Sequence, residues 1–327
     1  MVNKESTEIK QPKKPYLRPD YKPKNWWQRN WIELLTIAVG VIIIHIFLLF
    51  KAFNGNELNS TNASEFGSFI GGYMGTLFAL VSVIFLYTTL RDQRRTSEIE
   101  KFETRFFELI RLHRDNVQEI TLKTQNGKKI FVLFIREFRE IMKIVKDVFK
   151  NDKLEKKQII EISYLAFFYG IGPNSTRILK NSLSDYNKTK VKKLTEELQS
   201  QKQEVKKERN FNYVPFEGHQ SRLGHYYRHL FQSIAYCHNK KIDIDKYEYI
   251  KLIRAQLSNH EQALLFLNSI SKLGKPWKDE NLIKTYRLIK NIPEDFFDPK
   301  KEIDIKELYP EMIFEYEEST VAKIITK

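Results

Sequence analysis

Residues 66–90 read FGSFIGGYMGTLFALVSVIFLYTTL and contain no charged side chain. A helix needs about 20 apolar residues to cross a hydrocarbon core about 30 Å thick, and this stretch is long enough. Residues 31–50, WIELLTIAVGVIIIHIFLLF, form a second such stretch, in which Glu33, Thr36 and His45 are the polar or charged interruptions. The two stretches predict a transmembrane hairpin with spans at 31–50 and 66–90.

Positive charge is concentrated on the outer flanks of this hairpin. Residues 1–30 carry eight Lys and Arg side chains, and three arginines follow the second span within residues 91–95. In the connecting loop, residues 51–65, Lys51 is the only Lys or Arg side chain. The positive-inside rule therefore predicts a multi-pass protein with two spans and both termini in the cytoplasm.

The whole chain is basic, with 55 Lys+Arg against 41 Asp+Glu and a formal net charge of +14. Such a charge favours contact with phosphate groups, either of lipids or of nucleic acid. Residues 1–30 contain four prolines and no apolar periodicity, so we expect a basic disordered arm that lies against membrane lipids, with nucleic acid as the alternative partner. The single cysteine, Cys237, excludes an intramolecular disulfide.

Gly67, Gly71 and Gly75 are spaced by four residues in the second span. Such glycines allow the backbone of another helix to approach closely. The contact would be made either with the first span or with a second copy of the chain, as a homo-oligomer. His45 is also a functional candidate, because a titratable side chain inside a membrane is costly.

Beyond residue 90 apolar side chains recur at helical spacing, which predicts a mainly α fold with an all-helical cytoplasmic domain. We expect a first helical part at 91–183, a charged linker or exposed helix at 184–210, and a second helical part at 211–327. The helices predicted most clearly are at 128–150, 156–172, 221–238, 246–272 and 278–290.

The stretch FEGHQSRLGHYYRHLF, residues 216–231, is unusually rich in histidine. On a helix that begins near Ser221, the side chains of Arg222, His225 and His229 lie opposite the apolar residues. These three side chains therefore face either solvent or a polar site.

Three interpretations of this polar face stay open. His225 and His229 have the i, i+4 spacing of two zinc ligands, but no HExxH motif or cysteine pair completes a site, so we expect no metal and no cofactor. Arg222 and His229 resemble the R-x4–6-H motif of HEPN-type ribonucleases, in which His moves a proton at a ribose 2′-OH and Arg stabilises the phosphate. The third interpretation is a surface that docks another segment or a partner.

A second polar stripe is predicted in the next helix. Within residues 249–270 the second half is apolar on nearly all sides, which is typical of a buried helix, yet Arg254, Glu261 and Asn268 recur every seven residues. Buried charges need partners. We expect a polar cluster in which Arg254 and Glu261 meet groups from the histidine-rich helix or Glu217, just before it.

Three blocks of sequence, at 105–117, 216–238 and 249–270, together resemble the AbiC-type phage abortive-infection family. The similarity extends over most of residues 102–290, and a leading pair of transmembrane helices fits it. The resemblance implies bacterial anti-phage defence by arrest of the infected cell. It implies no agreed chemistry and no catalytic residues.

The sequence thus favours an effector of the bacterial inner membrane that is not an enzyme. Its helical domain would sense infection, or a phage or defence-system partner, and its spans would disturb the membrane. Two alternatives remain: a membrane-tethered ribonuclease that uses Arg222 and His229, with His225 beside them, and a scaffold that recruits a separate toxic enzyme.

Overall fold

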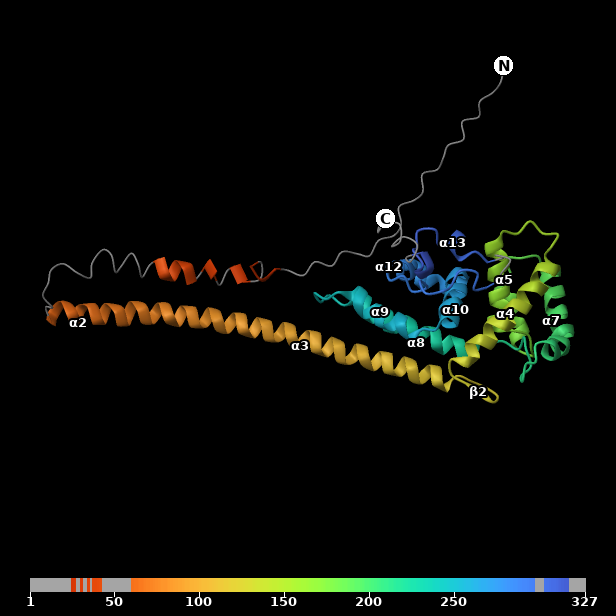
Figure 1. Ribbon diagram of the computed structural model, residues 1–327, viewed down its shortest axis with the longest axis horizontal. Coiled ribbons are helices and arrows are strands. Elements are labelled where there is room, and N and C mark those ends of the chain that lie inside the picture. The colour runs from red at the N-terminus through yellow and green to blue at the C-terminus, as the bar shows by residue number, and fades with distance from the viewer. Residues whose placement is uncertain are drawn as a thin grey trace, which may run out of the picture. The chain divides into compact units, whose positions relative to one another are not determined.

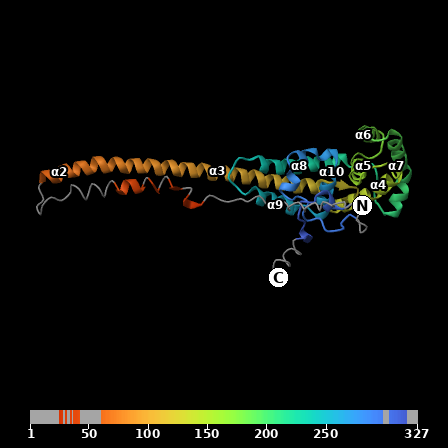
Figure 2. The same ribbon diagram turned by 90° about the horizontal axis from the view of Figure 1, so that it is seen from above.

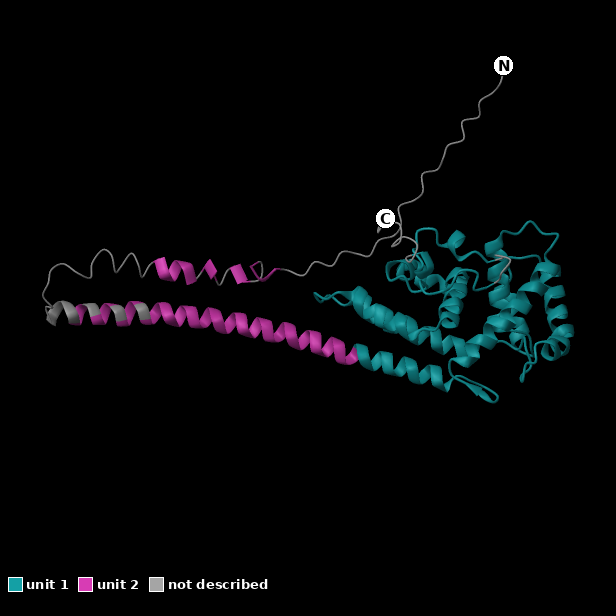
Figure 3. Cartoon of the chain, viewed as in Figure 1, with its two compact units in different colours: residues 1–19, 106–327 teal, residues 20–105 magenta. Residues whose placement is uncertain are grey.

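The computed structural model describes residues 25–27, 30, 31, 34, 35, 37–42, 60–297 and 303–317. The backbone of these residues is mainly helical, as the sequence predicts (Figure 1). The chain divides into two compact units, residues 20–105 and residues 106–327 with 1–19 (Figure 3). The boundary between the units falls within one long helix, α3 (Gly75–Glu119).

In the unit of residues 20–105, α2 (Ser60–Phe69), the π-helical turn η1 (Ile70–Met74) and α3 follow one another directly. Within the described ranges, Gly67–Glu119 is the one helix long and apolar enough to cross a membrane, and its apolar window is not buried at all. This helix covers residues 67–90 of the second predicted span, and the helical backbone already begins with α2 at Ser60.

The first predicted span is described only in part. Its described residues between 31 and 42 are helical. Residues 43–59, with His45 and most of the predicted outer loop, lie outside the described residues, as do residues 1–24 of the basic arm. The two-span hairpin and its orientation therefore stay predictions.

In the unit of residues 106–327, α4 (Lys129–Val148) packs against α5 (Lys156–Tyr169), α7 (Lys188–Glu208) and α10 (Asn259–Ile270), and Figures 1 and 2 show α4, α5 and α7 side by side. Phenylalanines at 131, 134 and 138 on α4 are fully buried and form much of the core. The remaining elements are α6 (Ser175–Ser182), α8 (Gln220–Asn239), α9 (Lys246–Gln256), the 3-10 turn η2 (Lys272–Gly274), α11 (Lys275–Asp279), α12 (Leu282–Thr285) and α13 (Ile305–Leu308).

The charged segment 184–210, for which the sequence left a linker and a helix open, contains α7. Its amino-terminal end is capped by Asn187, whose side-chain oxygen accepts hydrogen bonds from the backbone N–H groups of Thr189 and Lys190. One side of α7 is buried, including Val191 and Leu198, while its many charges cover the other sides. A weakly apolar stripe is therefore sufficient to dock this helix on α4.

The single helix expected over 246–272 is wrong, because α9 ends at Gln256 and α10 begins at Asn259. Ser258 and Glu261 form a capping box: each side chain accepts a hydrogen bond from the backbone N–H of the other residue. Arg254 thus belongs to α9 and Glu261 to α10, and the predicted stripe does not lie on one continuous helix.

The mainly helical class is confirmed, with one short strand element between two helices of this domain. A small antiparallel hairpin, β1 (Thr121–Leu122) and β2 (Gln125–Asn126), joins α3 to α4. The backbone N–H of Gly127 closes it by donating to the carbonyl of Ile120. Strands of two residues leave no periodic pattern, so the sequence could not predict them.

Candidate functional site

The site begins where the chain entering α8 crosses the end of α5. Gly170 and Gly218 both have positive φ angles, 66° and 84°, and a Cβ on either residue would collide with backbone atoms of the other segment. The backbone N–H of His219 donates to the carbonyl of Phe168 at 2.9 Å. This close crossing fixes His219 as the amino-terminal cap residue of α8.

His219 and Glu137 form a buried pair at this crossing. The Nε2 atom of His219 lies 3.0 Å from Oε2 of Glu137, and the two side chains are 3% and 0% exposed. Glu137 also accepts hydrogen bonds from the Tyr213 hydroxyl at 2.6 Å and from the Phe216 backbone N–H at 2.7 Å. We call Glu137, His219, Tyr213 and Phe216 the α4 junction.

The α4 junction stabilises a negative charge in the interior. Burial alone raises the pKa of Glu137, but the charge and hydrogen bond of His219 and the donors from Tyr213 and Phe216 outweigh it, so the pKa is lowered. The rings of Phe134 and Phe167 lie against His219, with centroids 4.2 and 4.8 Å from it. The junction therefore ties α4, the segment before α8 and α8 itself together through polar contacts in an apolar surrounding.

The three polar side chains predicted on the face of α8 differ in burial and in partners, although the ring centroids of His225 and His229 are 6.3 Å apart. Arg222 is half-buried, and its Nε atom donates to the carbonyl of Thr121 in β1 at 3.0 Å. His225 is exposed, whereas His229 is half-buried. Arg222 thus joins α8 to the hairpin, and the ring of His229 lies near a polar side chain of α3.

This side chain is His113, near the carboxyl-terminal end of α3. Its ring lies 6.3 Å from that of His229 and 5.2 Å from that of Tyr226, measured between centroids. The side chain is 3% exposed, and neither ring nitrogen has a hydrogen-bond partner among the described residues. Burial, together with the positive charges of His229 and Lys128, lowers the pKa of His113 from 6.5 to about 4. The ring is therefore neutral at pH 7.

A pocket of about 280 Å³ lies beside this histidine, and we call it the α3 pocket. Lys128, the cap residue of α4, donates from Nζ to the carbonyl of Gln256 at 2.7 Å across it. The positive charges at its rim come from Lys128 and Arg114. Its lining residues are His113, Arg114, Val117, Gln118, Lys128 and Gln256.

Arg254 and Glu261 are both buried, but each has its own partners. Arg254 donates from Nη1 to the carbonyls of Tyr286 and Arg287. Glu261 accepts from Ser258 in the capping box and from the hydroxyl of Tyr226 at 3.3 Å.

The predicted Arg254–Glu261–Glu217 cluster therefore does not take the expected form. Glu217 is exposed, and α8 contributes Tyr226 to Glu261 rather than one of the basic side chains of its polar face. Asn268 lies elsewhere and donates to the hydroxyl of Tyr164.

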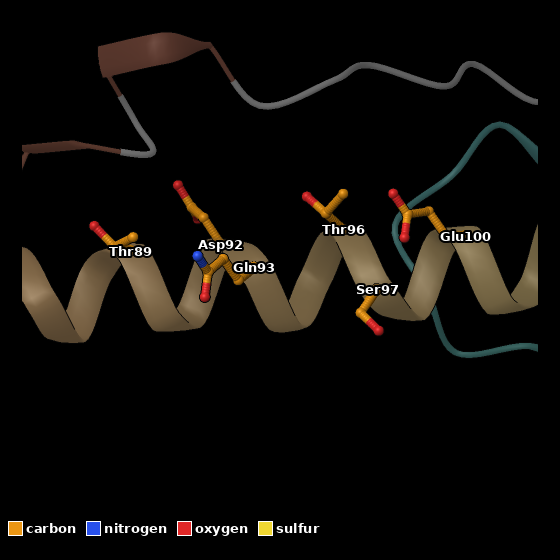
Figure 4. A pocket seen from close by; sticks show the side chains of 6 residues that line it. All are labelled: Thr89, Asp92, Gln93, Thr96, Ser97 and Glu100. Carbon is orange, nitrogen blue, oxygen red and sulfur yellow. The ribbon is translucent and has the colours of Figure 1, made fainter.

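Within the described ranges, no group of three or more His, Cys, Asp or Glu side chains is placed to hold a metal ion. A shallow depression on α3 is lined by polar residues of this one helix, and Figure 4 shows their side chains on its successive turns. It offers no converging charges. The lining residues are Thr89, Asp92, Gln93, Thr96, Ser97 and Glu100.

Sequence reasoning missed Glu137, Tyr213 and His113 as parts of a site. Glu137 stands within the apolar pattern of residues 128–150, and a charge at a predicted core position is the signal that could have identified it. His113 occupies an apolar position of the α3 pattern for the same reason. Their partners come from distant segments, and no local pattern names those.

The fold and the site define a mainly helical protein with an uncovered apolar helix and a polar junction at the start of α8. Comparison with known families is more specific: residues 218–297 match the family described as "Putative phage abortive infection protein". The resemblance predicted from the sequence is thereby confirmed for a segment that begins at Gly218 and extends beyond α12. The match supports a role in phage defence.

No curated protein matches the chain, and no solved structure matches it. The matched segment contains His219, Arg222, His229, Arg254 and Glu261. His113 and Glu137 lie outside it, so their roles are argued from geometry alone.

Proposed function

We propose that this protein is an abortive-infection effector of the bacterial inner membrane. Its helical unit senses infection or a partner, and its apolar helices then disturb the membrane. The observation that carries the proposal is the family match at 218–297 combined, in one chain, with the apolar helix Gly67–Glu119. The output is physical damage to the barrier rather than a chemical reaction.

The apolar surface supports the membrane part of the proposal. Phe78, Val83 and Leu86 on α3 are 63%, 62% and 59% exposed, and none of the apolar window is buried in the described part of the chain. So large an uncovered apolar surface is unfavourable in water and favourable in lipid. Arg91, Arg94 and Arg95 would then lie at the cytoplasmic surface.

The π-helical turn η1 supports an oligomeric contact through Gly67, Gly71 and Gly75. In an unbroken α-helix Gly67 and Gly75 would be rotated by about 80° from one another. One π-turn accommodates an extra residue and reduces this to about 20°, which aligns the glycines on one face. Apart from the backbone of the helix itself, a Cβ at any of the three would meet no atom of the described residues within 4 Å, so this face can accept another helix.

Gly71→Ile tests this contact, with Gly72→Ile as the matched control. Both glycines lie in η1 and both have open space at Cβ, but Gly72 points roughly 80° away from Gly71 in a π-helical turn. We expect Gly71→Ile to abolish protection in plaque assays while the protein still accumulates in the membrane, because a branched side chain prevents close approach. Gly72→Ile should protect like the wild type.

Equal protection by both variants would contradict the glycine contact. Equal loss of protection in both variants, with normal protein levels, would indicate that the helix acts without a preferred face.

Topology can be tested with a cysteine placed at Ser60. An impermeant thiol reagent should label this cysteine in intact spheroplasts, and labelling only after lysis would contradict the proposed orientation.

The ribonuclease alternative gains little support from the site. Arg222 uses its Nε atom to hold the β1 carbonyl, which is a structural contact, and His225 is exposed rather than directed at Arg222. The alternative predicts RNA cleavage by residues 96–327 that stops in Arg222→Ala and in His229→Ala. That result would replace the membrane mechanism.

A further inference from the structure

We propose that the α3 pocket binds a small ligand of the phosphate class, through Arg114 and Lys128 at its rim and His113 in its wall. The pocket lies within the unit of residues 106–327, between the last turns of α3, the start of α4 and the end of α9.

His113 supplies the first argument. A buried polar group without a hydrogen-bond partner is costly, and native proteins rarely keep one without use. A neutral imidazole has one donor and one acceptor nitrogen, and both lie without a partner in the described part of the chain. A protonated phosphate oxyanion offers both an acceptor oxygen and an O–H donor, so it can satisfy either ring nitrogen.

Charge supplies the second argument. The rim side chains Arg114 and Lys128 are cationic, and no carboxylate lines the pocket. Glu261 interacts electrostatically with Lys128, but it is fully buried, does not line the pocket, and accepts hydrogen bonds from Ser258 and Tyr226. An anion in the pocket therefore meets two cationic side chains and no lining carboxylate, and arginine and lysine are the usual side chains for phosphate.

Size restricts the ligand. The volume of about 280 Å³ is just below the range for drug-sized ligand sites, which is about 300 to 1,000 Å³. Gln118 and Gln256 can hydrogen-bond neutral groups next to the anion, and Val117 offers a small apolar surface. The pocket accordingly fits inorganic phosphate, pyrophosphate or a small phosphorylated metabolite.

The position of the pocket on α3 indicates a regulatory role for the ligand. Four of the six lining residues belong to α3, the same helix whose amino-terminal part carries the apolar segment. A ligand that orders the end of α3 would bias the conformation of the helix that enters the membrane. This regulatory role rests on the proposed function, whereas binding itself does not.

Calorimetric titration of the full-length protein in detergent micelles with inorganic phosphate, and separately with pyrophosphate, tests the proposal. We expect saturable binding to one site and a Kd raised roughly tenfold or more in Arg114→Gln, because a charge-assisted contact is lost. Arg111→Gln is the matched control. It makes the same change three residues earlier on α3, where Arg111 pairs with Glu108 and Asp115 outside the pocket, and it should leave the Kd unchanged.

His113→Phe completes the test, because it keeps an aromatic ring beside Tyr226 but removes both nitrogens. It should weaken binding without unfolding the protein. The absence of saturable binding, or equal weakening in the two arginine variants, would overturn the proposal. So would a loss of binding confined to Lys157→Gln, since Lys157 lines a different basic pocket with Lys278 and Lys284.

Failure of regulation can be told apart from failure of binding. If phosphate binds as expected but Arg114→Gln protects cells like the wild type, the binding site is confirmed and the proposed regulatory role is wrong. If Gly71→Ile has no effect on protection, the proposed membrane mechanism falls while the binding data are unaffected.

Discussion

Two buried histidines, His219 at the α4 junction and His113 at the α3 pocket, are both 3% exposed but have opposite environments. His219 lies 3.0 Å from a buried carboxylate and helps to fix the start of α8. His113 has rings on two sides and no hydrogen-bond partner in the described ranges. Burial alone thus does not distinguish a structural histidine from one that is available to a ligand. The distinction comes from the hydrogen-bond partners of the ring nitrogens.

The difference also separates two kinds of polar group in one helical unit. At the α4 junction the carboxylate of Glu137 is paired with three groups, Tyr213, Phe216 and His219, and only Nδ1 of His219 has no partner among the described residues. The α3 pocket keeps an unpaired ring and two cationic side chains at a surface depression. The α4 junction contributes to the stability of the fold, whereas the α3 pocket leaves polar groups available to a ligand.

The largest effect is expected from Glu137→Ala. It leaves His219, Tyr213 and the Phe216 N–H buried without their acceptor, and breaking a buried pair in this way costs on the order of 3–5 kcal/mol. Thermal and urea unfolding of the full-length protein in detergent should show this loss, together with reduced protein in cells.

Glu140→Ala is the control for that change. Glu140 lies one turn further along α4 and is 7% exposed, but its partners Lys143 and Arg209 are 61% and 44% exposed and can be solvated when it is lost. We expect a cost of about 1 kcal/mol or less. Equal costs for Glu137→Ala and Glu140→Ala would remove the distinction between the α4 junction and an ordinary surface pair.

A somewhat smaller effect is expected from acid, through His113. Its pKa is about 4 in the folded protein and 6.5 in the unfolded chain, so between these values the unfolded chain binds more protons. The contribution of neutral His113 to the free energy of unfolding is therefore fully present above pH 6.5. It falls by on the order of 3 kcal/mol as the pH is lowered toward 4.

Because Glu137 and other groups also titrate in acid, the measurement is the difference between the wild type and His113→Phe. The wild type should lose more stability than the variant between pH 6.5 and 4. At pH 7 the variant should be at least as stable, since it removes two unpaired polar atoms. Parallel pH profiles would mean that His113 has a partner in solution, and the contrast with His219 would disappear.

Much of the helical unit could be predicted from the sequence, because apolar spacing reports which side of a helix is buried. α4 and α8 lie within a few residues of their predicted ranges, and α5 ends at Tyr169, three residues before the predicted end at 172. The break between α9 and α10 was missed although its signal was present: Ser258 and Glu261 have the spacing of a capping box. The apolar residues Ile250, Ile253, Leu257 and Leu264 keep helical spacing across the break, which concealed it.

The site could be predicted only in part. The sequence identified Arg222, His225 and His229 as one polar face, but their different partners depend on β1 and α3, which are distant in sequence. His219 was visible as one of the clustered histidines, whereas the donors around Glu137 come from a loop with irregular backbone, including Phe216 at φ 67°. Tertiary contacts of this kind leave no periodic trace.

The central claim is that the protein stops phage by damaging the membrane. The most direct test follows membrane potential and RNA integrity together in infected cells that express the wild type, Gly71→Ile or residues 96–327 alone. The account predicts that potential falls before RNA is lost in wild-type cells, and that neither the variant nor the fragment depolarises the cells. RNA cleavage that precedes depolarisation, or cleavage by the soluble fragment, would contradict it.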